Sequence, residues 1–314
     1  MALDPTIRLL LDAAIAAGRP ALHTLSPADA RKMMRDTRAP IQGPILDTVS
    51  QQDRTIPGPA GQIPVRIYRP KAAATDAKLP VLVFFHGGGW VIGDIETHHT
   101  VCQRFAQDGD LLVVSVDYRL APEHRYPAAV DDCWVATQWV AANAASIGGD
   151  AAKLAVGGDS AGGNLAAIIA LMARDAGAPK VGYQCLIYPA VDALANTGSM
   201  ARNAEGYLLT TAAMTYFYDH YAPNKADRSD WRCSPLRAAT LAGVAPAMVI
   251  TAGFDPLRDE GADYARRLAA DGVRVEYVEY GSLIHGFFGM PGVLPQARRG
   301  ITTAAQAVRE ALGG

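Results

Sequence analysis

The chain has 314 residues, of which 50% are hydrophobic, and its formal net charge at pH 7 is −2. This length and apolar content allow one large α/β core with an additional segment and do not require two domains. Because the net charge is small and the basic residues are scattered, nucleic acid and anionic membranes are excluded as expected partners. No run of about 18 apolar residues is present, so no membrane-spanning helix is expected.

The N-terminal 48 residues show helical patterns before the first expected strands. Helices are predicted over residues 6–17, directly after Pro5, and over residues 27–35, directly after Ser26. A proline in the first turn and a serine at the N-cap are both typical of helix starts.

The same N-terminal segment and the cysteines predict a cytoplasmic location. The apolar stretch at residues 9–11 is interrupted by Asp12, and only Arg8 stands where a signal peptide would carry its basic region. The four cysteines are widely spaced, which predicts free thiols in a reducing compartment. They are Cys102, Cys133, Cys185 and Cys233.

The apolar run at residues 81–85 predicts a buried strand that leads into a glycine loop, His86–Trp90. Three consecutive residues without Cβ atoms allow backbone N–H groups to point at a reacting oxygen. We expect the N–H groups of Gly87 and Gly88, together with that of Ala161, to form an oxyanion hole.

A glycine-flanked serine, Ser160, lies between a predicted strand at residues 154–156 and an apolar helical pattern at residues 164–169. The motif Gly158–Gly162 at such a strand-to-helix turn predicts a nucleophile elbow, in which the serine hydroxyl is exposed at the edge of the sheet. The flanking glycines fit because a tight turn leaves no room for Cβ atoms on its neighbours. The same string is also compatible with a helix N-cap serine after a glycine-rich loop.

Two further strand patterns deliver an acid and a histidine to the same edge. The strand at residues 247–253 leads to Asp255, and the strand at residues 273–280, after a helix at residues 260–271, leads to His285. The chain order serine, aspartate, histidine is that of α/β-hydrolase triads. We therefore predict that His285 acts as base and then acid, and that Asp255 orients it.

Several nearby polar residues are interpreted as structural. Asp259, Glu260 and Asp263 are expected to be solvated charges at a helix start, with Asp259 kept as a possible replacement for Asp255. Asp159 is expected to orient backbone within the elbow, and His86 to fix the glycine loop. His98 and His99 are expected to lie at the surface or to cap a helix. Arg119 and Glu123 are expected to form an ion pair.

The combination of motifs resembles the hormone-sensitive-lipase-like bacterial esterases, in the subgroup whose elbow reads GDSAG. The segments that carry the resemblance span residues 50 to 290. They are His86–Trp90, Asp117–Ala129, Gly158–Asn164, Asp255–Glu260 and Ile284–Phe287.

The resemblance implies an α/β-hydrolase fold, a mostly parallel central sheet flanked by helices, with a helical cap. It also implies hydrolysis of small-molecule esters with short acyl chains, without metal or cofactor. Residues 1–48 and 191–235 are expected to form the cap, with a helix at 210–218, and residues 49–190 and 236–314 the catalytic core. Substrate-binding residues are expected among the large apolar side chains near these segments, namely Trp90, Tyr188, Tyr207, Leu208, Met214, Phe217 and Phe287, although core packing is the alternative for each.

Three functional alternatives remain open. The same residues would serve an amidase, a lactonase or an acyltransferase, and a ligand-binding protein on the same scaffold is a further class. A lipase acting at an oil–water interface would need an apolar lid, whereas residues 191–235 carry several charges. The resemblance further suggests a homodimer formed by pairing of the strand at residues 273–280.

Overall fold

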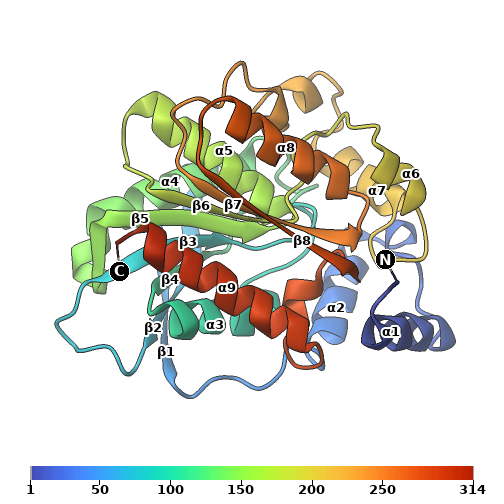
Figure 1. Cartoon of the computed structure of the whole chain (residues 1–314), viewed down its shortest axis with the longest axis horizontal. Coiled ribbons are helices and arrows are strands. Elements are labelled where there is room, and N and C mark those ends of the chain that lie inside the picture. Colours follow the sequence, from blue (N-terminus) through green and yellow to red (C-terminus); the bar gives the residue numbers. More distant parts are fainter. Residues whose placement is uncertain (1, 314) are drawn as a thin grey trace.

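The computed structural model describes residues 2–313 and contains one eight-stranded sheet (Figure 1). The strand order is β1-β2-β4-β3-β5-β6-β7-β8. Strand β2 is antiparallel to both of its neighbours, β1 and β4, and all neighbouring strands from β4 to β8 are parallel. The strands are β1 (Val49–Gly58), β2 (Gly61–Pro70), β3 (Leu79–Phe85), β4 (Leu112–Val116), β5 (Gly149–Asp159), β6 (Tyr183–Ile187), β7 (Ala247–Phe254) and β8 (Val275–Ile284).

The central strands are apolar on both faces because helices cover both sides of the sheet. In β3 all seven residues are buried, and alternate side chains enter two different apolar clusters. Val81, Val83 and Phe85 belong to the first cluster, and Leu82 and Phe84 to the second. The period-two alternation of a strand thus divides one apolar run between two cores.

Two layers of helices sandwich the sheet. Helices α4 (Ala128–Asn143), α5 (Ala161–Ala176) and α8 (Arg258–Ala270) lie over one face, and α3 (His99–Gly109) and α9 (Pro295–Ala311) over the other (Figure 1). The predicted α/β-hydrolase architecture, a mostly parallel sheet flanked by helices, is confirmed. No helix in this described part of the chain is long and apolar enough to cross a bilayer.

The remaining α-helices gather at the end of the sheet toward which the parallel strands point (Figure 1). They are α1 (Pro5–Ala16), α2 (Pro27–Arg38), α6 (Gly198–Arg202) and α7 (Thr211–Tyr221). Asp4 caps α1, Ser26 caps α2 and Thr210 caps α7 through their side-chain oxygens. Short 3-10 helices are η1 (Leu22–Thr24), η2 (Glu96–His98), η3 (Ala144–Ile147), η4 (Asp227–Ser229), η5 (Pro235–Arg237) and η6 (Phe287–Gly289).

Candidate active site

Ser160 occupies a strained turn between β5 and α5. Its backbone has φ 56° and ψ −117°, a conformation that is costly for a residue with a side chain and persists only where the surroundings enforce it. A Cβ on Gly158 or Gly162 would collide with the carbonyl oxygen of Phe85. The glycines therefore allow the elbow to pack directly on the end of β3.

The side chains of Ser160, His285 and Asp255 form a continuous hydrogen-bonded chain. His285 Nε2 lies 2.8 Å from Ser160 Oγ, and His285 Nδ1 lies 2.7 Å from Asp255 Oδ2. Asp255 is fully buried, His285 is 7% exposed, and Ser160 is partly exposed. The structure thus brings together three residues that are 30 and 125 positions apart along the chain.

The acidic residues after β7 are divided between different environments. The second oxygen of Asp255, Oδ1, accepts a hydrogen bond from the Leu257 N–H at 2.8 Å. Asp259 instead accepts a bond from the Ser199 N–H in helix α6, whereas Nδ1 of His285 is paired with Asp255. Glu260 is only 2% exposed, and the interpretation of this residue as a solvated charge is wrong.

The glycine loop carries N–H groups for which residues 2–313 provide no hydrogen-bond acceptor. Gly88, Gly89 and Trp90 all have positive φ values, of 122°, 58° and 59°, and this curls the loop tightly. Among residues 2–313, the N–H groups of Gly88, Gly89 and Ala161 donate to no backbone acceptor outside the regular elements, and no side chain accepts from them. The Gly87 N–H differs from our expectation, because it donates to Asp159 Oδ1 at 2.9 Å.

Asp159 links the elbow to the glycine loop rather than acting within the elbow alone. Its Oδ1 also lies 3.1 Å from Nε2 of His98, which is 1% exposed and thus not a surface residue. Burial disfavours the charged carboxylate, but His98, Arg38 and the Gly87 N–H outweigh burial and lower the pKa of Asp159 to about 2. The glycine loop is therefore anchored to an ionised carboxylate next to Ser160.

His86 fixes the loop as expected. Its Nδ1 donates to the Gly87 carbonyl at 2.8 Å, its ring stacks on Tyr118 at 4.3 Å, and its own carbonyl accepts from the Tyr118 hydroxyl at 2.7 Å. Burial, followed by the nearby His98, lowers the pKa of His86 to about 4, so the ring is neutral at pH 7. His99 is also buried and contacts the Tyr68 hydroxyl.

Three of the predicted substrate-binding residues lie near His285. The ring of Tyr188 is 4.6 Å from the His285 ring, and Phe287 lies 5.7 Å from Tyr188. Leu208 is 59% exposed, and its side chain approaches Gly286. Tyr207 packs on Phe254, at 5.0 Å between ring centroids.

The other predicted pocket residues lie in the apolar cluster between α7 and the glycine loop. The Trp90 ring stacks on Tyr221 at 4.4 Å, with 5° between the ring planes, and Met214 belongs to the same buried cluster. Phe217 lies directly over Gly89, where a Cβ would meet its ring. This cluster roofs the glycine loop with aromatic side chains.

Charged side chains elsewhere pair with one another. Arg119 binds Asp132 at 2.8 Å and Glu123 binds Arg31 at 2.6 Å, so the predicted pair between Arg119 and Glu123 is wrong. A surface cleft of about 540 Å³ contains none of the predicted site residues. It is lined by Arg35, Asp53, Arg54, Thr55, Pro64, Val65, Arg66, Asp94, Ile95, Glu96 and Asp117.

Metal-binding and disulfide chemistry find no support within residues 2–313. No group of three or more histidine, cysteine, aspartate or glutamate side chains is arranged to hold a metal ion there. The four cysteines are free and buried. Burial raises the pKa of the Cys102 thiol to about 12, so this thiol is not a nucleophile at neutral pH.

Comparison with known proteins identifies the family. A family model described as alpha/beta hydrolase fold matches residues 82–289. The carboxylic ester hydrolase LipN of Mycobacterium tuberculosis is 44% identical over 295 residues, which cover 92% of this chain and 77% of that protein. The ethyl acetate hydrolase of Pseudomonas putida is 36% identical over 321 residues, which cover 99% of this chain and 100% of that protein.

A solved structure agrees with these relatives. An ester hydrolase from the metagenome of Lake Arreo, in complex with a derivative of bipyridine phosphonate, is 44% identical. It superposes with a TM-score of 0.95 over 99% of this chain and 100% of that chain. The chain belongs to the α/β-hydrolase fold family and, within it, to the hormone-sensitive-lipase-like carboxylesterases.

Proposed function

We propose that this protein hydrolyses carboxylic esters with short acyl chains through an acyl-enzyme formed on Ser160. The observation that carries the proposal is the chain of two short hydrogen bonds from Ser160 Oγ through His285 to Asp255. A serine hydroxyl is a weak nucleophile at neutral pH, and a hydrogen-bonded imidazole is the group that activates it.

The two nitrogens of His285 have different tasks. Nε2 removes the Ser160 proton during attack on the ester carbonyl and then donates it to the departing alcohol. Nδ1–H stays bonded to Asp255, whose carboxylate stabilises the imidazolium that forms. A water molecule activated by Nε2 then attacks the acyl-enzyme, and the acid product leaves.

The negative oxygen of each tetrahedral intermediate needs donors that are not already engaged. We assign Gly88 and Ala161 to this task, as expected from the sequence, and Gly89 in place of Gly87. The Gly87 N–H instead fixes the glycine loop through its hydrogen bond to Asp159. A single preorganised oxyanion donor is worth about 3 kcal/mol in the transition state.

The acyl and alcohol groups are proposed to lie between the core and a cap formed by residues 1–48 and 191–235. Tyr188 contacts the His285 ring, Phe287 packs near Tyr188, and Leu208 lies beside Gly286. Trp90 and Met214 belong to the apolar cluster above the glycine loop. The second cap segment carries charged side chains that favour dissolved esters over a lipid interface. They are Arg202, Glu205, Asp219, Lys225, Asp227 and Arg228.

Replacing Ser160 by alanine tests the proposed function. With p-nitrophenyl butyrate as substrate, Ser160→Ala is expected to lower kcat by about 10⁴-fold or more while the circular dichroism spectrum stays unchanged. A folded wild-type protein without activity on a series of short acyl esters would overturn the proposal. A folded Ser160→Ala variant with wild-type activity would reject the nucleophile.

We also propose a cellular location and an oligomeric state for this protein. Four buried, reduced thiols suit a reducing compartment, and we propose the cytoplasm; cell fractionation that recovers the protein elsewhere would reject this location. Strand β8 is an edge of the sheet, and we propose that it pairs with a second copy of the chain.

A further inference from the structure

We propose that Ser199 and Asp259 are positioning residues that dock the cap helix α6 onto the loop carrying Asp255, and thereby hold Asp255 against His285. The inference rests on the proposed function, because it assigns a role for Asp255 in orienting the histidine. It gives the second cap segment a task in catalysis beyond covering the substrate.

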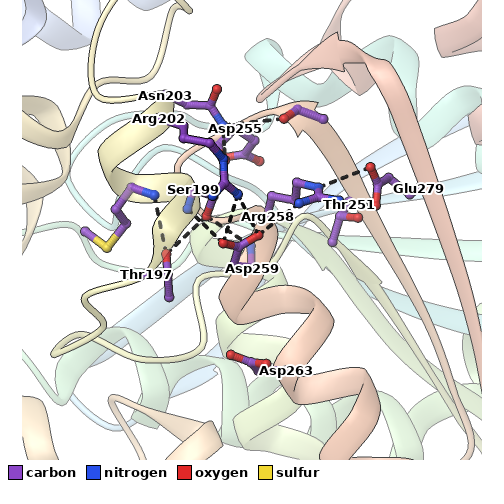
Figure 2. A network of polar contacts seen from close by, with 12 residues as sticks. Thr197, Ser199, Arg202, Asn203, Thr251, Asp255, Arg258, Asp259, Asp263 and Glu279 are labelled. Atoms are coloured by element: carbon purple, nitrogen blue, oxygen red, sulfur yellow. Dashed lines mark hydrogen bonds and ion pairs between the residues drawn. The ribbon is translucent and has the colours of Figure 1, made fainter. Parts of the chain in front are cut away.

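Ser199 and Asp259 bond to each other in both directions (Figure 2). The Ser199 N–H donates to Asp259 Oδ2 at 2.8 Å, and the Asp259 N–H donates to Ser199 Oγ at 3.1 Å. The same Ser199 hydroxyl donates to the Pro256 carbonyl at 2.7 Å. Ser199 is fully buried, so water does not compete for these bonds.

A second cap residue holds the same loop. Asn203 Nδ2 donates to the backbone carbonyl of Asp255 at 3.1 Å and approaches that of Gly253 at 3.4 Å. The backbone carbonyls of Gly253, Asp255 and Pro256 therefore have hydrogen-bond partners in the segment around α6, which lies 50 to 57 residues away in the chain. The core itself contributes the Leu257 N–H to the Asp255 carboxylate.

The charge of Asp259 is balanced by two arginines that extend the contact. Arg202 of α6 lies 3.2 Å from Asp259, and Arg258 lies 3.0 Å from it. Arg258 also binds Glu279 of β8 at 3.0 Å (Figure 2). Strand β8 ends at Ile284, directly before His285, so the network contacts the supports of both the acid and the histidine.

The docking of α6 controls the geometry of the Asp255–His285 pair. The 2.7 Å bond between Asp255 and His285 requires a fixed loop, and a misplacement of about 1 Å in a catalytic constellation lowers rates by up to about 10²-fold. Loss of the Ser199 hydroxyl leaves the Pro256 carbonyl and the Asp259 N–H without their partners. We therefore expect the loop to move relative to β8.

The experiment compares Ser199→Ala with Thr210→Ala. Thr210 caps α7 in the same cap segment, where its hydroxyl oxygen accepts from the Ala213 N–H, so its loss should weaken the cap without removing any of the hydrogen bonds that hold the loop of Asp255. Ser199→Ala is expected to lower kcat about tenfold with KM within about twofold, whereas Thr210→Ala leaves kcat within about twofold. Ser199→Thr, which keeps a hydroxyl, is expected to recover most of kcat.

A spectroscopic signal separates positioning from general loss of stability. The proton in the 2.7 Å bond between His285 Nδ1 and Asp255 is expected to give a strongly deshielded NMR resonance. Ser199→Ala should shift or broaden this resonance, and Thr210→Ala should leave it unchanged. The proposal is overturned if Ser199→Ala keeps the resonance and wild-type kcat, or if both variants lose kcat in proportion to their loss of stability. Failure of the proposed function would differ, because wild type itself would then be inactive.

Discussion

At the scale of single residues, Glu260 is a buried acidic side chain whose pKa is raised far above its usual range. It is 2% exposed, and its Oε1 accepts from the N–H groups of Val191 at 2.7 Å and Asp192 at 3.3 Å. Burial is the main cause that raises the pKa of Glu260 to about 8, assisted by the charges of Asp192 and Asp255. The neutral acid keeps Oε1 as an acceptor without placing a second negative charge beside Asp255.

Replacing Glu260 by glutamine is expected to change the pH dependence of stability. The folded state binds the Glu260 proton more tightly than the unfolded state, so this residue's contribution is fully present below pH 4.5 and is lost as pH rises toward about 8. Within that window the free energy of unfolding of wild type should fall, relative to Glu260→Gln, by up to about 1.4 kcal/mol per pH unit. Urea unfolding of both proteins across this pH range measures the difference, and a constant difference would contradict the prediction.

The residues of the candidate site differ in how visible they are in the sequence. Ser160, Asp255 and His285 each follow an apolar strand pattern, and parallel strands deliver such residues to one edge of a sheet. Gly89, which we propose as an oxyanion donor in place of Gly87, could not be singled out from the sequence. The direction of an N–H group depends on φ, and three successive residues here have positive φ. Ser199 and Asn203 have no local signal, since their partners lie more than 50 residues away.

At the scale of elements, helix α2 is attached to the glycine loop by an arginine that sequence patterns did not single out. Arg31 donates through Nε to the Val91 carbonyl at 2.8 Å and through Nη2 to the Ala121 carbonyl at 2.9 Å. The Ala121 N–H in turn donates to the Trp90 carbonyl at 2.9 Å. The forked guanidinium therefore joins helix α2 to the loop that holds the proposed oxyanion donors.

Replacing Arg31 by lysine is expected to lower kcat/KM about tenfold, because a single ammonium cannot reproduce the fork that holds the strained loop. Arg35→Lys is the matched control on the same helix. Arg35 pairs with Asp94 and its side chain is 62% exposed, so kcat/KM should stay within about twofold. Steady-state kinetics on p-nitrophenyl butyrate decide, and equal effects of the two substitutions would exclude a specific role for Arg31.

Elements with strong local patterns were predicted well, and their ends less so. The strand predicted over residues 81–85 is β3, Leu79–Phe85, and the helix predicted over residues 27–35 is α2, which continues to Arg38. The last turn of α2 lies beside the loop that follows β8 and carries His285, and there Arg38 Nη1 approaches the Gly286 carbonyl at 3.4 Å. Such tertiary contacts extend a helix beyond what local propensity indicates.

At the scale of the whole molecule, the sheet has two edges with different chemistry. Strand β1 presents mainly polar, exposed residues, among them Gln52 and Asp53. Strand β8 also carries two glutamates, Glu276 and Glu279, but it presents Tyr277, which is 40% exposed. Unpaired backbone groups at a sheet edge are a template for pairing with another strand, and exposed charged residues discourage it. We expect the proposed self-association to take place through β8, where Tyr277 offers an apolar contact.

The oligomeric state in solution tests whether the chain forms a dimer through β8. Sedimentation velocity at micromolar concentration is expected to give twice the 33.2 kDa chain mass for wild type. Tyr277→Lys is expected to shift the protein toward the monomer, because a lysine at an edge strand opposes pairing, whereas Gln52→Lys on β1 should leave the mass unchanged. A monomeric wild type would reject the dimer, and dissociation by Gln52→Lys alone would assign the interface to β1. Because the proposed site lies within one chain, the monomeric variant should retain wild-type kcat, so that assembly and catalysis are separable properties of the fold.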